Sequence, residues 1–261
     1  MGIDYKTIAS HVLNEKIHRP LSGTLSGHAA GEPFEKTVYR KMKEMYPGNV
    51  FKQYEYLNKL FLENKQARTF EARNKLFNSD LVSFLLQRGK KSVEEWSPNN
   101  LFEEKQNDTA DIIYTKDGFF EIIDVKTRNM SIDGQAPNII SAYKLAQAMK
   151  LMLQTKEFDK IDIVYVEVEW KLIGDYLVAN KVHVASIFKT DPEKLYINWA
   201  AAMQIQFHVS DLPQNFNGTK EEWARAYLTH YYYQALKRAD DMKTKFADPF
   251  EDYINKKITL F

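Results

Sequence analysis

The 261-residue sequence predicts an α/β protein in which a mixed central sheet is flanked by helices. Three observations support this class. Helical patterns dominate residues 33–86, strand patterns separated by one helix begin at residue 109, and a long helix follows residue 219. Helices before, between and after the strands can cover both faces of one sheet. With 44% hydrophobic residues the chain can form a sizeable core, and we expect residues 1–261 to form a single domain.

The first part of the chain predicts mainly helices. The segment Ser22–Pro33 is rich in small residues and glycine, which is typical of a loop. Proline is favoured in the first turn of a helix, so we expect a helix from Pro33 to about Met45, where a Pro-Gly pair follows. Residues 51–86 are rich in Leu, Phe, Glu, Lys and Asn and predict further helices. Residues 88–91 form a basic turn, and a second break follows at 96–100.

The second part of the chain predicts strands, with one helix between them. Residues 109–126 predict a hairpin, and residues 139–154 predict a crossover helix. A strand is expected at 161–170, and apolar and polar residues alternate over 204–209. Thr219 is followed three residues later by a glutamate, which is a capping box and predicts a helix that continues to about Phe246.

The hairpin brings acidic side chains together. With Asp117 and Gly118 as its two turn residues, Asp111 and Asp124 lie directly opposite each other, with Cβ atoms roughly 5 Å apart. Lys126 projects from the same face as Asp124 because side chains alternate along a strand. Facing carboxylates repel each other, so the hairpin requires a group that compensates their charge.

A hard cation is such a group. Mg²⁺ takes oxygen ligands, typically one or two carboxylates together with water and substrate phosphate, and the carbonyl of Val125 is a further candidate ligand. A lysine beside the cation orients or deprotonates the attacking water, or stabilises the charge that develops on phosphorus. The D-x(12)-D-x-K spacing is weak by itself, and a solvated surface hairpin is the alternative. The strand 119–125 is almost wholly apolar, however, and a buried aspartate needs a partner.

The residues Asp111 and Asp124-Val-Lys126 resemble the PD-(D/E)xK nuclease signature, with Ala110 where that family often has proline. The likeness extends along nearly the whole chain, in one order, to the type II restriction endonucleases of the HincII type, also called HindII-like. It is carried by residues 22–36, 100–112, 124–129, 135–147, 195–209 and 216–219.

The resemblance implies a restriction-endonuclease-like fold and a homodimer that cleaves double-stranded DNA with Mg²⁺. It implies the site GTYRAC, cut at its centre to leave blunt ends with 5′-phosphates, and a companion DNA methyltransferase. By motif position, Asp111 and Asp124 are metal ligands and Lys126 is the catalytic lysine, although its role as base or stabiliser stays open. The same resemblance implies that several residues bind DNA: an intercalating Gln135, its loop neighbours Ala136 and Asn138, and Gln106 and Asn198 in two further segments.

Physical arguments agree with this implication. A pyrimidine–purine step unstacks easily, so a site with any Y-R centre can be recognised through its deformability. Asparagine and glutamine are good bidentate readers of adenine. A palindromic site matches a two-fold dimer because each half-site meets the same protein surface.

Several charged residues have simpler interpretations. Glu32 and Glu35 are interpreted as surface charges of a helix, and support of the metal site is the alternative. Lys144 is expected in solvent, and Arg128 contacts either phosphate or a structural carboxylate. His208 is expected to be a hydrogen-bonded histidine of a sheet. Arg88, Lys90 and Lys91 are interpreted mainly as a solvated turn.

Composition limits the remaining possibilities. The net charge is +1, so a protein that coats nucleic acid without preference is not expected. The absence of cysteine excludes disulfides and thiolate metal sites. The N-terminus is too polar for a signal peptide and no apolar run spans a bilayer, so we expect a cytoplasmic protein without a membrane partner.

Three other functions are the alternatives. A magnesium nuclease of repair or recombination has the same architecture and is separated from a restriction enzyme by the products of digestion. A DNA-binding protein without catalysis is disfavoured by the intact Asp111, Asp124 and Lys126. A carboxylate-pair glycosidase needs its acid and base on opposite sides of a sugar, whereas these aspartates share one sheet face.

Overall fold

The structure is a computed structural model that describes residues 2–19, 28–106, 108–132 and 134–258. Its centre is a six-stranded sheet in the order β1-β7-β6-β4-β3-β2. These strands are β1 (Ile17–His18), β2 (Val50–Phe51), β3 (Ile112–Lys116), β4 (Phe119–Asn129), β6 (Ile161–Ile173) and β7 (Tyr176–Ser186). Strands β4 and β6 are parallel and the other neighbours are antiparallel, so the predicted mixed sheet is confirmed.

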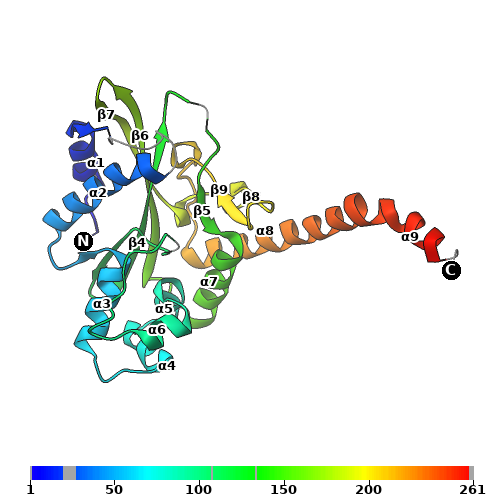
Figure 1. Ribbon diagram of the computed structural model, residues 1–261, viewed down its shortest axis with the longest axis horizontal. Helices are drawn as coiled ribbons and strands as arrows, with labels where there is room; N and C mark the ends of the chain where they lie inside the picture. The colour runs from blue at the N-terminus through cyan, green and yellow to red at the C-terminus, as the bar shows by residue number, and fades with distance from the viewer. Residues whose placement is uncertain (1, 20–27, 107, 133, 259–261) are drawn as a thin grey trace.

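Helices cover both faces of this sheet (Figure 1). One face packs against α1 (Tyr5–Asn14) and α2 (His28–Met45). The other face packs against α3 (Gln53–Glu63), α5 (Asp80–Leu86), α6 (Lys90–Glu95), α7 (Ala142–Thr155) and the first turns of α8 (Lys220–Asp241). The short helix α4 (Phe70–Asn74) lies beside α6.

The alternation of side chains along the strands divides the core in two. Ile112 and Ile123 are buried against α1 and α2, whereas Ile113 and Ile122 are buried on the opposite face. Each strand of the central hairpin is therefore apolar on both sides, as expected for a strand in the middle of a sheet. This burial fixes the register of the hairpin, because a slip of one residue exchanges the two faces.

The predicted turn and register of the hairpin are confirmed. Asp117 and Gly118 have positive φ angles of 51° and 79°, as a tight two-residue hairpin turn requires. Lys116 pairs with Phe119, and the ladder continues without a shift to the pair Ile112 and Ile123. Asp111 and Asp124 are the next residues at that end of the ladder.

Some element boundaries differ from the sequence predictions. Helix α2 begins at His28, so Pro33 lies inside it and the loop predicted for residues 28–33 is wrong; residues 22–27 of that prediction lie outside the described residues. Residues 90–95 are helical instead of forming a turn. Strand β7, which the sequence analysis did not predict, pairs with β6 after a turn at Gly174, whose φ is 60°.

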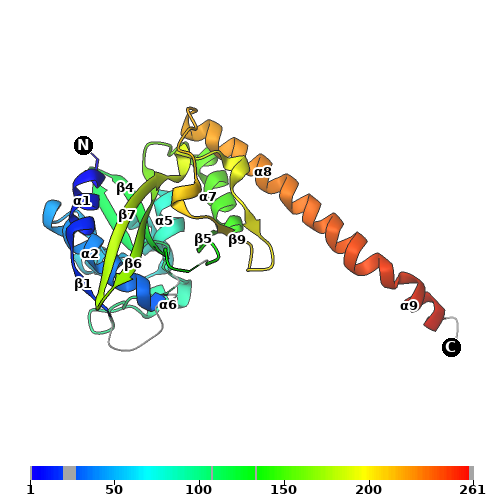
Figure 2. The same cartoon turned by 90° about the horizontal axis from the view of Figure 1, so that it is seen from above.

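A second sheet carries part of the candidate site. It has three strands in the order β5-β9-β8, namely β5 (Asn138–Ser141), β9 (Gln204–Gln206) and β8 (Ile197–Asn198). Figure 2 shows this small sheet beside α7 and α8. The capping box at Thr219 begins α8 as predicted.

The chain continues beyond α8 as a π-helical segment (Met242–Ala247), a 3₁₀ turn (Asp248–Phe250) and α9 (Glu251–Ile258). This arm extends away from the body in both views (Figures 1 and 2). Among the helices in the described ranges, none combines the length and the apolarity that crossing a membrane requires.

Candidate active site

The two predicted aspartates lie together at one end of the central hairpin. The backbone N–H of Val125 donates a hydrogen bond of 2.7 Å to Oδ2 of Asp111, which ties Asp111 to the strand that carries Asp124. Burial raises the pKa of the Asp111 carboxyl above its usual value, and the charge of Asp124 and a hydrogen bond with it raise that pKa further. The pair is therefore an acidic site whose negative charge is only partly compensated.

Lys126 lies beside this pair. Its Nζ donates a hydrogen bond of 2.7 Å to Oδ1 of Asp124. Burial lowers the pKa of Lys126, but the charges of Asp124 and Asp111, the hydrogen bond and the charge of Glu35 together hold it above the usual value. The side chain is therefore an ammonium group held against Asp124, beside Asp111.

A third carboxylate comes from α2 on the opposite side of the sheet. Glu35 is largely buried and forms an ion pair with Lys52, whose Nζ is also 3.2 Å from Oε1 of Glu104. Burial raises the pKa of Glu35, and the nearby charge of Asp111 raises it further against the effect of Lys52. The interpretation of Glu35 as a surface charge is wrong, because the helix turns this residue towards the aspartate pair. The interpretation of Glu32 is confirmed: its side chain is exposed and pairs with Lys36.

These residues border a cleft of about 580 Å³. Val125, Lys126 and Glu35 lie at its wall together with three of the predicted DNA-binding residues, Gln106, Gln135 and Asn138. The remaining lining residues extend the cleft along β4 and into the preceding and following loops: Gly31, Glu32, Thr127, Arg128, Asn129, Ile132, Gly134, Pro137, Trp170 and His208. Acidic, basic and amide side chains from distant parts of the chain thus face one open space.

The comparison with known proteins agrees with this geometry. The family model of the restriction endonuclease HincII matches residues 8–254. The chain belongs to the HincII restriction endonuclease family. It is 59% identical over 250 residues to the type II restriction enzyme HindII of Haemophilus influenzae strain Rd, covering 96% of this chain and 97% of the relative. The type II restriction enzyme HincII of Haemophilus influenzae has the same identity and coverage. Membership identifies the chain as a type II restriction endonuclease, a site-specific deoxyribonuclease.

The remaining predicted DNA-binding residues of this HincII family member are Ala136 and Asn198. Ala136 is half-buried in the loop between Gln135 and Asn138. Asn198 does not line the cleft; it lies on β8 at a separate hollow that α8 borders. It is nevertheless linked to Asn138 through Gln206, a residue that the sequence analysis did not select.

A buried polar network joins the catalytic strands to the loop after β9. The fully buried Glu167 of β6 accepts hydrogen bonds from the N–H of Ser210, at 3.0 Å, and from Nδ1 of His208, at 2.8 Å. Arg128 donates to Oγ of Ser210 and lies 3.8 Å from Asp211. The hydrogen-bonded role predicted for His208 is confirmed, and Arg128 has a structural partner while it also lines the cleft.

Two predictions about basic residues were wrong. Lys144 is not in solvent: its Nζ donates to Oγ1 of Thr109 at 2.6 Å, and burial lowers its pKa. Arg88 is 7% exposed and forms a 2.6 Å ion pair with Asp108, so it stabilises the loop before β3. The sequence next to either residue does not indicate burial. Only the packing of α5 and α7 buries these two side chains.

The donor set suits a small hard cation. In the described part of the chain, no cluster of three or more His, Cys, Asp and Glu side chains forms a potential metal site. Mg²⁺ does not require such a cluster, because it is commonly held by one or two carboxylates with water and phosphate as the other ligands. The acidic pair Asp111 and Asp124, which contacts the cleft residues Val125 and Lys126, fits that pattern.

Proposed function

We propose that this restriction endonuclease, acting as one domain over residues 1–261, hydrolyses double-stranded DNA at a short palindrome with Mg²⁺. By family resemblance the site is GTYRAC, cut at the centre to give blunt ends with 5′-phosphates. The observation that carries the proposal is the contact of Lys126 with Asp124, beside Asp111, while Lys126 and Val125 lie at the wall of one cleft. This combination of two acids and an ammonium group suits phosphodiester hydrolysis.

In this proposal, Asp111, Asp124 and the backbone carbonyl of Val125 hold the metal ion. When bound, Mg²⁺ lowers the pKa of a water ligand and polarises the phosphoryl oxygen. The separation of the hairpin strands is fixed by a ladder that is buried on both faces, so the two carboxylates are preorganised before DNA arrives. Preorganised charge avoids reorganisation during the reaction.

Lys126 acts as a positive charge in this proposal. Its raised pKa keeps the proton on Nζ at neutral pH, which favours stabilisation of the developing phosphorane over a role as general base. Glu35 adds a negative charge near Asp111 and Lys126, and its pairing with Lys52 anchors α2 to the site. Glu35 is therefore a positioning residue that sets the charge around the aspartates.

The DNA-binding role of Gln106, Gln135 and Asn138 is supported by their place at the wall of the cleft. Gln135 and Ala136 lie in the loop before β5, and Asn138 is the first residue of β5. We assign Gln135 to intercalation at the pyrimidine–purine step, which costs little to unstack. Gln106 and Asn198 approach the same DNA from the loop before β3 and from β8.

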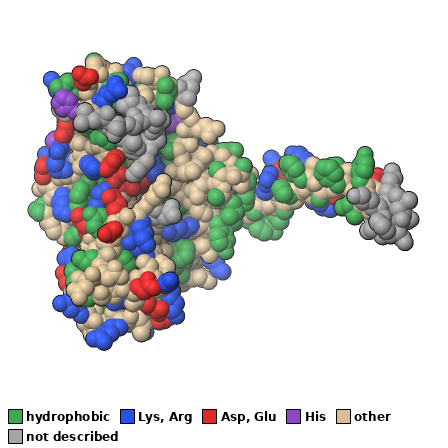
Figure 3. Space-filling view, viewed as in Figure 1, with side chains coloured by type: hydrophobic (Ala, Val, Ile, Leu, Met, Phe, Trp, Pro, Cys, Tyr) green, Lys and Arg blue, Asp and Glu red, His purple; other side chains and the backbone are tan. Residues whose placement is uncertain are grey.

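We propose that the enzyme is a homodimer and that the C-terminal arm contributes to its interface. Large apolar side chains along the arm and the end of α8 are 46–72% exposed. They are Tyr232, Tyr233, Leu236, Met242, Phe246, Phe250, Tyr253 and Ile254. Figure 3 shows hydrophobic side chains continuing from the body onto the arm.

The area of this surface fits a second copy of the chain. At roughly 200 Å² for each large side chain, the exposed fractions correspond to about 900 Å² of largely apolar surface. The largest apolar patch of a typical monomer measures only a few hundred Å². A stable interface buries about 800 Å² on each partner. Because every copy carries an arm, a two-fold arrangement buries both arms at once and matches a palindromic site.

Substitutions in the arm test this interface. We expect the double substitution Phe246→Asp and Phe250→Asp to place unpaired charges in the interface and to shift the enzyme from dimer to monomer, measured by sedimentation or light scattering. Thr244→Asp is the matched control, because it adds one charge to an exposed polar position of the same arm. A double variant that stays as dimeric as the control contradicts the arm interface and leaves cleavage chemistry untouched.

Digestion of a plasmid tests the activity. With Mg²⁺ we expect discrete fragments whose blunt, 5′-phosphorylated ends map to the centre of one hexamer, and with a chelator we expect no cleavage. Nicking that depends on DNA structure would identify a repair nuclease instead. A different hexamer would correct the specificity and leave the reaction unchanged.

Lys126→Ala tests the catalytic assignment. We expect cleavage to fall by roughly a thousandfold or more while binding of a duplex with the mapped hexamer persists. Lys220→Ala is the control, because Lys220 belongs to α8 and its Nζ donates to the carbonyl of Ile161, away from the cleft. Near-normal cleavage by Lys126→Ala would remove this lysine from the mechanism.

Two further expectations concern the cellular setting. We propose that the enzyme acts in the cytoplasm, where the chromosome of its host needs protection from it. A companion DNA methyltransferase with the same recognition sequence supplies that protection. Protection of the plasmid by methylation within the mapped hexamer, measured in the same digestion, tests this pairing.

A further inference from the structure

The small sheet presents a polar face made of amide side chains. Ile197 and Ile205 pair across β8 and β9 and are buried in the core. The alternate residues of β9, Gln204 and Gln206, therefore lie on the opposite face. Asn138 of β5 is directly opposite Gln206 in the ladder. Amide side chains from three strands thus meet on one face, namely those of Asn198, Gln206 and Asn138. Asn138 and Asn198 are predicted to contact DNA.

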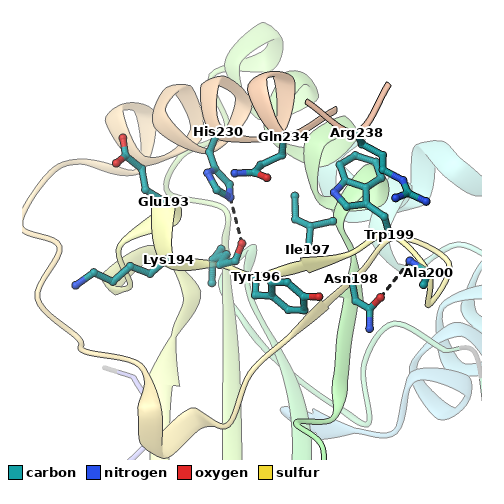
Figure 4. A pocket seen from close by; sticks show the side chains of 11 residues that line it. Glu193, Lys194, Tyr196, Ile197, Asn198, Trp199, Ala200, His230, Gln234 and Arg238 are labelled. Atoms are coloured by element: carbon teal, nitrogen blue, oxygen red, sulfur yellow. Dashed lines mark hydrogen bonds between the residues drawn. The ribbon is translucent and has the colours of Figure 1, made fainter. Parts of the chain in front are cut away.

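Backbone groups fix the orientation of the first amide. Oδ1 of Asn198 accepts hydrogen bonds of 3.1 Å from the N–H groups of both Ala200 and Ala201. The contact with Ala200 is visible in Figure 4. A backbone N–H can only donate, so the atom facing it must be the amide oxygen and not the nitrogen. The Nδ2 group of Asn198 is consequently a donor directed elsewhere, towards Gln206.

The orientation of the Asn198 amide determines the orientations of the Gln206 and Asn138 amides. Nδ2 of Asn198 donates to Oε1 of Gln206 at 2.9 Å, so Oε1 is the only atom of that amide that can face Asn198. The Nε2 group of Gln206 then donates to Oδ1 of Asn138 at 2.8 Å. The result is a directional chain of hydrogen bonds that starts at two backbone N–H groups and ends at Asn138, here called the amide relay.

We propose that Gln206 is a specificity-determining residue, which sets the hydrogen-bonding polarity that Asn138 presents to a DNA base. The inference rests on the proposed function, because it takes Asn138 as a base-contacting residue. The relay occupies Oδ1 of Asn138 and leaves its Nδ2 hydrogens available at the wall of the cleft. Asn138 thus holds its oxygen towards Gln206 and turns its donors to DNA.

An amide that presents its donors recognises a particular class of base edge. In the major groove, N7 and O6 of guanine, N7 of adenine and O4 of thymine are acceptors, whereas the exocyclic amines of adenine and cytosine are donors. Bidentate pairing with adenine requires the amide oxygen as well as the nitrogen. With its oxygen held towards Gln206, Asn138 presents its Nδ2 hydrogens to DNA, which directs it to acceptor edges in preference to the bidentate adenine contact that an isolated asparagine favours.

Gln206→Glu reverses the end of the relay without changing the shape of the side chain. A carboxylate only accepts, so it can still accept from Nδ2 of Asn198. It cannot donate to Asn138, whose amide must rotate to donate its own Nδ2 hydrogen. Oδ1 of Asn138 then faces the cleft as an acceptor. One substitution therefore inverts the polarity at Asn138 and preserves it at Asn198.

The experiment scans the mapped hexamer with base analogues. Each purine in turn is replaced by its 7-deaza form, which removes the N7 acceptor, and cleavage rates of the duplexes are compared. For the wild-type enzyme we expect a loss of about tenfold or more at the position that Asn138 contacts. For Gln206→Glu we expect slower cleavage of the unmodified site by a similar factor. We also expect its sensitivity to 7-deaza substitution to be lost at that one position and kept at the others.

A second measurement gives the positive counterpart. Replacing the contacted base by one that offers a donor, adenine N6 or cytosine N4, is expected to raise the relative cleavage rate of Gln206→Glu by about tenfold over wild type. Gln204→Glu is the matched control, since it adds the same charge to the same face of β9 outside the relay. It should leave the pattern of sensitivities as in the wild type.

The outcomes separate this inference from the function on which it rests. Failure of the wild-type enzyme to cut at any defined hexamer overturns the proposed function itself. If the wild-type enzyme cuts but Gln206→Glu slows every duplex by one common factor, Gln206 only supports the sheet and the relay has no part in specificity. Retention of the full wild-type sensitivity pattern by Gln206→Glu overturns the inference equally.

Discussion

Two pairs of carboxylates in the same sheet have very different surroundings. Asp111 and Asp124 lie at the end of the β3–β4 ladder, where Asp124 contacts Lys126 beside the open cleft. Glu121 lies three residues before Asp124 on β4 and is paired with Asp162 of β6 in the parallel register. Odd and even positions of β4 face opposite sides of the sheet, so the two pairs are directed to different layers.

The second pair is satisfied by the protein. The hydroxyl of Tyr5 on α1 donates to Glu121 at 3.2 Å, and Asp162 accepts from the N–H of Ile163 and from the hydroxyl of Ser186. Burial and the charge of Asp162 raise the pKa of Glu121 to about 7. This pair can therefore carry a proton near neutral pH, and it needs no cation.

The difference shows that neighbouring acids alone do not define a nuclease site. Asp124 contacts the ammonium group of Lys126, and Lys126 and Val125, which are next to the pair, line the open cleft. The Glu121–Asp162 pair has hydroxyl and backbone donors instead. The decisive feature is which donors complete the carboxylates, and that depends on the layer that packs above each strand.

The largest effect expected from this comparison is on cleavage. Asp124→Asn removes one charge and one oxygen ligand from the proposed metal-binding pair, and we expect cleavage to fall by roughly a thousandfold or more. Asp162→Asn, the matched change in the other pair, should leave cleavage within about threefold of wild type. An amide oxygen can also accept the hydrogen bonds that Ile163 and Ser186 donate to Asp162. Rates on a duplex with the mapped hexamer measure both. Equal losses in the two variants would contradict the distinction between the pairs.

A smaller effect on cleavage is expected for a substitution of Glu35. We expect Glu35→Gln to slow cleavage by about 10- to 100-fold, as is typical when a residue that supports a metal site is changed. The loss follows because the amide no longer balances Lys52 or adds negative charge near Asp111. The Mg²⁺ concentration for half-maximal cleavage should change as well. Glu44→Gln, on the same helix but exposed and outside the cleft, is the control and should behave as wild type.

Glu121 is expected to affect stability and not cleavage. Its pKa is raised from 4.5 to about 7, so the folded protein binds a proton that the unfolded chain releases, and stability falls as the pH rises through this range. The cost of ionising the group at neutral pH is at most about 3 kcal/mol. Glu121→Gln should therefore flatten the decline in the free energy of unfolding between pH 4.5 and 7.

Denaturant unfolding at several pH values measures this effect, and the cleavage rate of Glu121→Gln serves as the internal control. An unchanged pH slope would mean that Glu121 is already ionised in the folded protein. A large loss of cleavage would mean that the two carboxylate pairs are coupled through β4 and do not have separate roles.

Local sequence determined the hairpin and its chemistry. The Asp117-Gly118 turn fixed the register because two adjacent residues with positive φ leave few alternatives. The period-two alternation of strands then placed Asp111 opposite Asp124 and Lys126 on the same face as Asp124, and the apolar run around them marked a central strand. Each of these inferences needs only residues within one hairpin.

Only the tertiary structure decided what surrounds that hairpin. Glu35 approaches Asp111 because α2 packs across the sheet, and Lys144 is buried because α7 packs against α5 and the loop before β3. The amide relay likewise joins three strands whose order in the small sheet is not the order in the chain. Local patterns determine which face a side chain occupies, but the free energy of a buried charge or amide depends on which distant partner completes its hydrogen bonds.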